Sequence, residues 1–141
     1  METGQVPLYE IEQGKGLVGL FDDPFRQTPV SYLSIPDLPL CDGALYVRGD
    51  SMYPLINSGD IVLYKKVGDV SNIVWGEVYL VSFSLDGDEY VVVKYVDRAD
   101  GDPDSVMLAG YGSRHSGMKI PLDSIRALGI VKASVRFNSM G

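Results

Sequence analysis

Residues 77–97 read EVYLVSFSLDGDEYVVVKYVD and decide the fold class. Two runs rich in valine, tyrosine and leucine flank the four residues 85–88, Leu-Asp-Gly-Asp, and this arrangement is typical of a β-hairpin. Asp-Gly favours such a turn because its two central residues must adopt positive φ values, which aspartate and glycine tolerate. We therefore expect the strands over 77–84 and 90–97 to pair in antiparallel fashion.

Similar short apolar runs continue on both sides of this hairpin, and turn residues separate them. We expect strands near residues 31–35, 44–48, 61–66, 77–84, 90–97, 106–109, 118–120 and 125–137. Only residues 52–57 resemble a short helical turn, with Pro54 in its first positions. The sequence therefore predicts an all-β domain over residues 30–141, mostly antiparallel and partly closed into a barrel-like shape.

The first 29 residues differ from the remainder of the chain. They contain glycines at 4, 14, 16 and 19 and prolines at 7, 24 and 29, with no sustained strand or helix period. We interpret residues 1–29 as an extended arm or linker. The total of 141 residues is close to the commonest size of one domain.

Composition excludes several classes of function. A net charge of -7 repels phosphate backbones, so we do not expect this chain alone to bind nucleic acid. Cys41 is the single cysteine and His115 the single histidine, which leaves no disulfide and no metal-ligand pattern. We expect no metal and no cofactor. The sequence also lacks an export signal and an apolar run long enough to cross a bilayer, so we expect a cytoplasmic protein without membrane contact.

A glycine turn presents the first candidate for chemistry. Residues 46–54 read YVRGDSMYP, in which a strand-like run ends at Gly49 and continues through Ser51. Glycine accepts strained backbone angles, and successive N–H groups at such a turn can point at a developing oxyanion. Ser51 is therefore a candidate nucleophile. Gly-Asp-Ser is also a common turn and serine a common helix cap, so from this segment alone the structural interpretation is the stronger.

A serine nucleophile needs a base, and the sequence offers a lysine rather than a histidine. His115 lies in the polar sequence Gly-Ser-Arg-His-Ser-Gly, which is typical of an exposed loop. Strand alternation places Lys94 on one face with Val92 and Val96, where its ammonium loses hydration and the neutral amine is favoured. A lysine that guards a strand edge and extends its amine into water explains the pattern equally well. The residues alone do not show that Lys94 meets Ser51.

Five segments, taken in order along the chain, carry a family resemblance. They are Val47–Pro54, Ser58–Leu63, Gly76–Val78, Val92–Val96 and Leu128–Val131. These segments resemble the catalytic domains of the LexA/UmuD/phage-repressor family of self-cleaving Ser-Lys peptidases, and the similarity covers about residues 30–137. The resemblance favours Ser51 and Lys94 as a catalytic dyad and implies a LexA-type peptidase and dimerisation domain.

The resemblance also implies a catalytic role for each residue of the site. Ser51 would attack the peptide bond, and neutral Lys94 would take the proton and return it. Backbone N–H groups of Asp50 and Ser51 would form the oxyanion hole. The implied reaction is intramolecular cleavage of a transcriptional repressor in an SOS-type response to DNA damage.

The substrate of that reaction would lie in the arm. Family members usually present Ala-Gly or Cys-Gly at the scissile bond, and the comparable residues 12–19 read EQGKGLVG. Lys15–Gly16 is our best candidate for the cleavage site. Glycine after the bond fits, whereas lysine replaces a small residue before it. Slow cleavage, a different site, a lost site and a flexible linker therefore remain alternatives.

The resemblance names partners as well. It implies a homodimer, activation by a RecA filament on single-stranded DNA, and DNA contact only through a helix-turn-helix module that this chain lacks. A fragment of a longer repressor and a short UmuD-like protein both fit this reading. Two other functions stay open: a catalytically idle dimerisation domain of a helix-turn-helix repressor, and a signal-peptidase-like enzyme that acts in trans.

Overall fold

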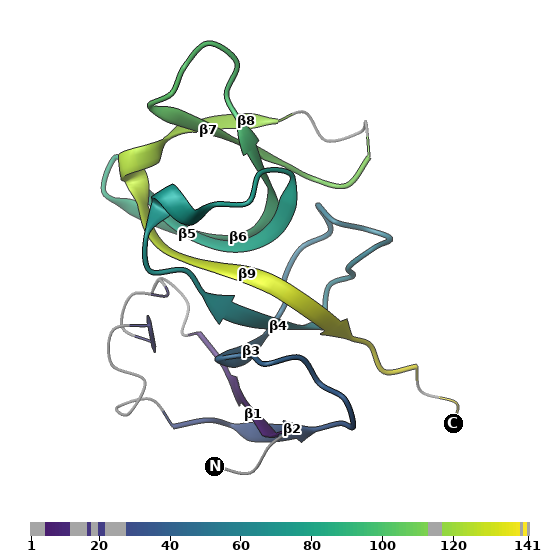
Figure 1. Cartoon of the computed structure of the whole chain (residues 1–141). Helices are drawn as coiled ribbons and strands as arrows, with labels where there is room; N and C mark the ends of the chain where they lie inside the picture. Colours follow the sequence, from purple (N-terminus) through teal and green to yellow (C-terminus); the bar gives the residue numbers. More distant parts are fainter. Residues whose placement is uncertain are drawn as a thin grey trace.

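The computed structural model describes residues 5–11, 17, 20–21, 28–112, 117–138 and 140. Within these residues nine strands form one mixed, mostly antiparallel sheet in the order β2-β1-β3-β4-β9-β5-β6-β7-β8 (Figure 1). The strands are β1 (Gln5–Tyr9), β2 (Ser31–Ser34), β3 (Gly43–Tyr46), β4 (Ile61–Lys66), β5 (Glu77–Leu85), β6 (Asp88–Arg98), β7 (Ser105–Ala109), β8 (Met118–Pro121) and β9 (Ile125–Val135). Two 3-10 turns, η2 (Val70–Asn72) and η3 (Leu122–Ser124), connect strands. The predicted all-β fold class is confirmed.

The hairpin at the centre of the prediction is present. β5 and β6 pair in antiparallel fashion from Glu77 opposite Val96 to Leu85 opposite Asp88. The two residues between the strands both have positive φ, 52° at Asp86 and 84° at Gly87. This is the backbone geometry for which Asp-Gly is suited, and it fixes the register of the whole hairpin.

Strand β9 links the two ends of the sheet, because it pairs with β4 on one side and with β5 on the other. In Figure 1, β7 and β8 curl over the β5–β6 hairpin at the top, and β1 and β2 lie at the bottom. Alternate residues of β5 enter different clusters: Tyr79, Val81 and Phe83 lie in one, and Leu80 in another. The curled sheet thus buries apolar side chains on both of its faces.

The structure adds a strand that the sequence pattern did not indicate. Strand β1 lies within the segment interpreted as an arm, antiparallel to β2 and parallel to β3. Its side chains Val6 and Leu8 are buried beside Ile61 and Leu63. Pro7 between them lacks an amide hydrogen and weakens a strand pattern, which explains why the alternation of Val6 and Leu8 was not recognised.

Candidate active site

Ser51 lies at the start of a tight turn that follows β3. Gly49 adopts a φ of 92°, in the region that favours glycine. The turn closes through hydrogen bonds from the Tyr53 amide to the Asp50 carbonyl (3.0 Å) and from the Ile56 amide to the Met52 carbonyl (2.9 Å). The peptide bond between Tyr53 and Pro54 is cis. Residues 52–57 form hydrogen-bonded turns and a bend without a helix, so the short helical turn expected here is absent. Ser51 itself is half-buried.

The turn is fixed to the rest of the domain on two sides. The side chain of Met52 is buried with Val47, Ile56 and Val62. The carbonyl of Ser51 accepts a hydrogen bond from the Tyr111 amide at 2.9 Å. The residue that bears the candidate nucleophile is therefore bound to a segment that lies just beyond β7.

Lys94 lies in β6 on the face that alternation predicted. It pairs with Tyr79 of β5, and its neighbours Val92 and Val96 pack with the cluster around Tyr79. The side chain is half-buried. Tyr95, the next residue, pairs with Ala109 of β7, two positions before the Tyr111 amide that contacts Ser51.

A small cavity lies between the Ser51 turn and β6. Its volume is about 60 Å³, and it is lined by Ser51, Met52, Val47, Arg48, Gly49 and Val91, Val92 and Val93. The lining thus ends one residue short of Lys94. Among the hydrogen bonds of the described residues, none joins the Ser51 hydroxyl to the Lys94 amine. The structure brings Ser51 to the part of β6 that precedes Lys94 without joining the two side chains.

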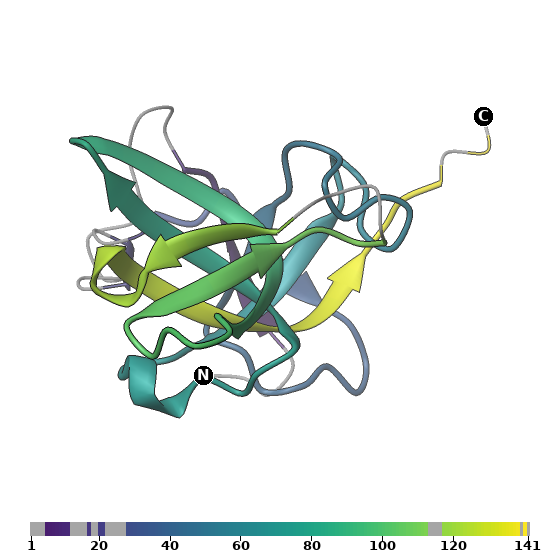
Figure 2. The same cartoon turned by 90° about the horizontal axis from the view of Figure 1, so that it is seen from above.

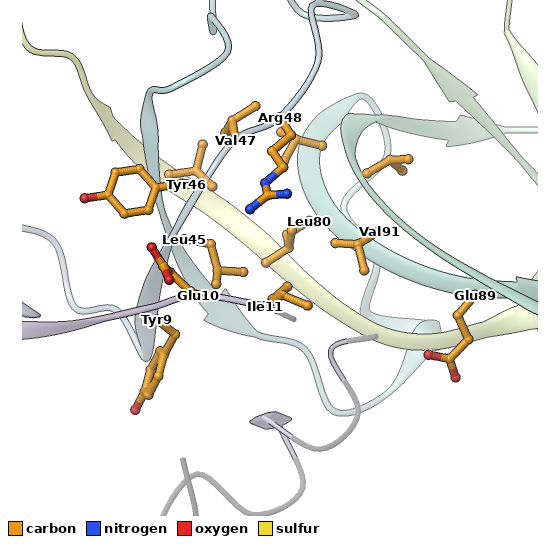
Figure 3. Close-up of a pocket in the computed structure, with 13 residues that line it drawn as sticks. Tyr9, Glu10, Ile11, Leu45, Tyr46, Val47, Arg48, Leu80, Glu89 and Val91 are labelled. Atoms are coloured by element: carbon orange, nitrogen blue, oxygen red, sulfur yellow. The ribbon is translucent and has the colours of Figure 1, made fainter. Parts of the chain in front are cut away.

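A larger groove continues from this cavity. It has a volume of about 210 Å³ and shares Val47, Arg48 and Val91–Val93 with the small cavity. At its other end it is lined by Tyr9, Glu10 and Ile11, where the chain leaves β1. In Figure 3 the guanidinium of Arg48 extends toward Leu80, with Glu10 and Glu89 farther out. The groove and the adjoining cavity together therefore run from residues 9–11 of the predicted arm to Ser51.

One wall of the groove is an open strand edge. β7 pairs only with Tyr95–Arg98 of β6, so residues 88–94 have a strand partner on the β5 side alone, within the part of the chain described. An extended peptide can add to such an edge through main-chain hydrogen bonds. The groove can thus hold a peptide in an extended conformation.

The predicted oxyanion donors lie at the same turn. The amides of Asp50 and Ser51 donate no hydrogen bond to another described residue. Two N–H groups at a turn without such a bond form the type of donor pair that stabilises an oxyanion.

Some of the predicted residues lie outside the described part of the chain. These are Lys15, Gly16 and His115. Among the described residues, no cluster of histidine, cysteine, aspartate and glutamate could hold a metal ion. In the same residues no helix is long and apolar enough to cross a membrane.

Sequence reasoning gave no role to three residues at this turn and groove. Asp60 was quoted only as part of a motif, yet its carboxylate is buried and pairs with Arg136. The Gly-Asp pair before a strand was the available signal for Asp60. No sequence signal pointed to Arg136, because it lies 76 positions away. Arg48 was quoted only as part of a motif, although it lines both cavities.

A comparison with known protein families gives a match that covers Ser51, Lys94 and the residues that line the groove. The family described as Peptidase S24-like has a model that matches residues 7–132. The match spans the second part of β1, the Ser51 turn, the groove and most of β9. A comparison with curated proteins gave no match.

Proposed function

The chain belongs to the Peptidase S24-like family, and from this membership we propose that it cleaves its own N-terminal arm with Ser51 as nucleophile and Lys94 as base. The groove is the observation that carries the proposal. Its lining includes Tyr9–Ile11, where the arm leaves β1, and the adjoining cavity reaches Ser51. An arm that follows this groove along the open edge of β6 is delivered to the nucleophile.

The chemistry proceeds in two steps. The Ser51 hydroxyl attacks the scissile carbonyl while the neutral amine of Lys94 takes its proton, and the amides of Asp50 and Ser51 hold the oxyanion. The lysine then gives this proton to the leaving amine. The peptide bond breaks, and an acyl-enzyme ester on Ser51 remains. Water hydrolyses the ester with Lys94 again as base, and the Ser51 hydroxyl is regenerated.

The proposal extends to the biological role. A chain with a charge of -7 does not bind DNA by electrostatic attraction, so DNA contact would belong to a separate helix-turn-helix module. We assign the domain to a homodimeric transcriptional repressor of the phage type. Its cleavage would be stimulated by a RecA filament on single-stranded DNA, as part of a response to DNA damage.

Self-cleavage across a pH series tests the catalytic proposal. Purified protein is incubated from about pH 6 to about pH 10, and the fragments are weighed by mass spectrometry. We expect the rate to rise with pH, because a general base accepts a proton only in its unprotonated form. Ser51→Ala and Lys94→Ala should each abolish the cut. Lys65→Ala, which removes an exposed lysine of β4, is the matched control and should cut normally.

The identity of the scissile bond has its own test. The cavity beside Ser51 has a volume of only about 60 Å³, so it favours a small side chain over lysine before the cut. Lys15→Ala should therefore accelerate cleavage at residues 15–16, and the masses of the fragments identify the bond. Equal rates for wild type and Lys15→Ala would contradict this assignment.

The second candidate is the idle dimerisation domain, and one observation favours it. The Ser51 hydroxyl and the Lys94 amine form no hydrogen bond with each other in the described structure. A chain that stays intact at every pH, with and without a RecA filament, and with Lys15→Ala, would support this candidate and refute the peptidase.

A further inference from the structure

An ion pair between the buried carboxylate of Asp60 and the exposed side chain of Arg136 braces the turn that carries Ser51. The carboxylate of Asp60 and the guanidinium of Arg136 are 2.9 Å apart, between the start of β4 and the residue after β9. We infer that this pair positions Ser51 for attack, an inference that rests on the proposed function. Neither residue lines the cavity beside Ser51, so both would act through the backbone of the turn.

Asp60 holds the base of the turn together. Its amide donates to the Asn57 carbonyl at 3.0 Å, and its carboxylate accepts from the Asn57 amide at 2.8 Å. Its carbonyl accepts from the Val47 amide at 2.8 Å, while the Gly59 amide donates to the Val47 carbonyl at 2.9 Å. The two ends of the excursion from Val47 to Asp60 are therefore bonded to each other.

Arg136 holds the outer part of the same turn. Its Nε donates to both oxygens of Asp60, at 3.0 and 3.2 Å. Its Nη2 donates to the carbonyls of Pro54 and Leu55 at 3.3 and 3.5 Å. In Figure 2 the end of β9 lies beside the loops that carry these carbonyls. One guanidinium thus joins the base of the turn to the residues three and four positions after Ser51.

The chemistry of the pair suits this role better than simple stabilisation. The side chain of Asp60 is 5% exposed, and a buried carboxylate is costly unless it is paired. A planar guanidinium can bind a carboxylate and neighbouring carbonyls at fixed angles, whereas a lysine ammonium is a flexible point charge. The guanidinium therefore fixes the orientation of the turn and also compensates the buried charge of Asp60.

Labelling of Ser51 by a fluorophosphonate measures positioning separately from folding. The rate is followed by mass spectrometry at a temperature where circular dichroism shows each variant to be folded. A concentration series separates the maximal rate kinact from the binding constant KI. The variants are Arg136→Ala, Arg136→Lys and Asp60→Asn. Arg126→Ala is the matched control, since Arg126 lies in β9 and, among the hydrogen bonds of the described residues, donates to the Asp123 carbonyl and not to the Ser51 turn.

We expect Arg136→Ala to lower kinact by about 10²-fold with KI unchanged, because a shift of about 1 Å at a reacting group costs this much. Arg136→Lys should recover little, and guanidinium ion below denaturing concentrations should restore part of the loss. Arg126→Ala should label at the wild-type rate. A folded Arg136→Ala protein with kinact within twofold of wild type would overturn the inference.

The proposed function can fail independently of this inference. If wild-type Ser51 is not labelled at all, the peptidase proposal fails, and amide hydrogen exchange then decides the role of the pair. Faster exchange in Arg136→Ala over residues 48–57, with β5 unchanged, would support a device that orders the turn. Unchanged exchange over residues 48–57 would overturn it.

Discussion

Replacement of Met52 by alanine tests how the Ser51 turn is held. Met52 is 2% exposed and packs with Val47, Ile56 and Val62, while Val93 and Val131 approach from β6 and β9. Alanine removes three buried heavy atoms, and core substitutions of this type cost roughly 2–5 kcal/mol. Because Val62, Val93 and Val131 belong to paired strands, they cannot move in to fill the cavity. We therefore expect a loss of about 3–5 kcal/mol, in the upper part of that range.

The assay is urea unfolding followed by circular dichroism, supported by thermal melting. For a chain of this size the expected loss lowers Tm by about 10 °C. Met118→Ala is the matched control, because Met118 is 41% exposed in β8 and surface changes usually stay within about 0.5 kcal/mol. Met52→Leu keeps the volume and should cost less than about 1.5 kcal/mol. An unfolding midpoint for Met52→Ala equal to that of Met118→Ala would refute the claim that this side chain anchors the turn.

Two further predictions concern other parts of the sheet. A Cβ at Gly43 would lie 2.5 Å from the Tyr64 hydroxyl and 2.8 Å from Cζ of that ring. Because Tyr64 is stacked against Phe21, Gly43→Ala should lower the free energy of unfolding in urea by about 1–3 kcal/mol. An unchanged free energy of unfolding would mean that the ring moves freely. The hydrogen bond from Arg136 lowers the pKa of Asp60, although burial opposes it. A carboxyl with a lowered folded pKa stabilises fully above its unfolded value of about 3.9 and loses this contribution as pH falls through the folded value. The stability gap between wild type and Asp60→Asn should therefore shrink below about pH 4, and a constant gap would contradict the assignment.

The sheet could be predicted largely from local patterns. Alternation and turn residues located the eight strands from β2 to β9, and Asp86-Gly87 fixed the hairpin. Apart from the missed strand β1, the errors lie at strand ends where a distant contact takes over. The last strand was expected to reach Phe137, but it ends at Val135, because Arg136 turns toward Asp60. The strand over 44–48 ends at Tyr46, because the chain at Val47 bonds to the Asp60 carbonyl and then turns at Gly49.

The site was less accessible to sequence reasoning than the fold. A glycine turn after a strand made Ser51 a candidate and an amine among valines made Lys94 one, but only the family resemblance favoured the two as a dyad. The groove could not be predicted, since it depends on how far β7 extends along β6 and on where β1 ends. These are properties of strand pairing between distant segments. The contacts between Arg136 and the Ser51 turn could not be predicted either, because no residue near Arg136 in the sequence indicates them.

Because β1 is paired on both sides, cleavage of the chain after β1 does not by itself release the amino-terminal piece. A cut between β1 and β2 leaves β1 hydrogen-bonded to both β2 and β3, with Val6 and Leu8 still in the interior. The amino-terminal piece would remain docked as a non-covalent part of the sheet until its strand peels away. Departure of that piece, rather than hydrolysis, would then set the delay between the chemical event and any change that a partner could sense.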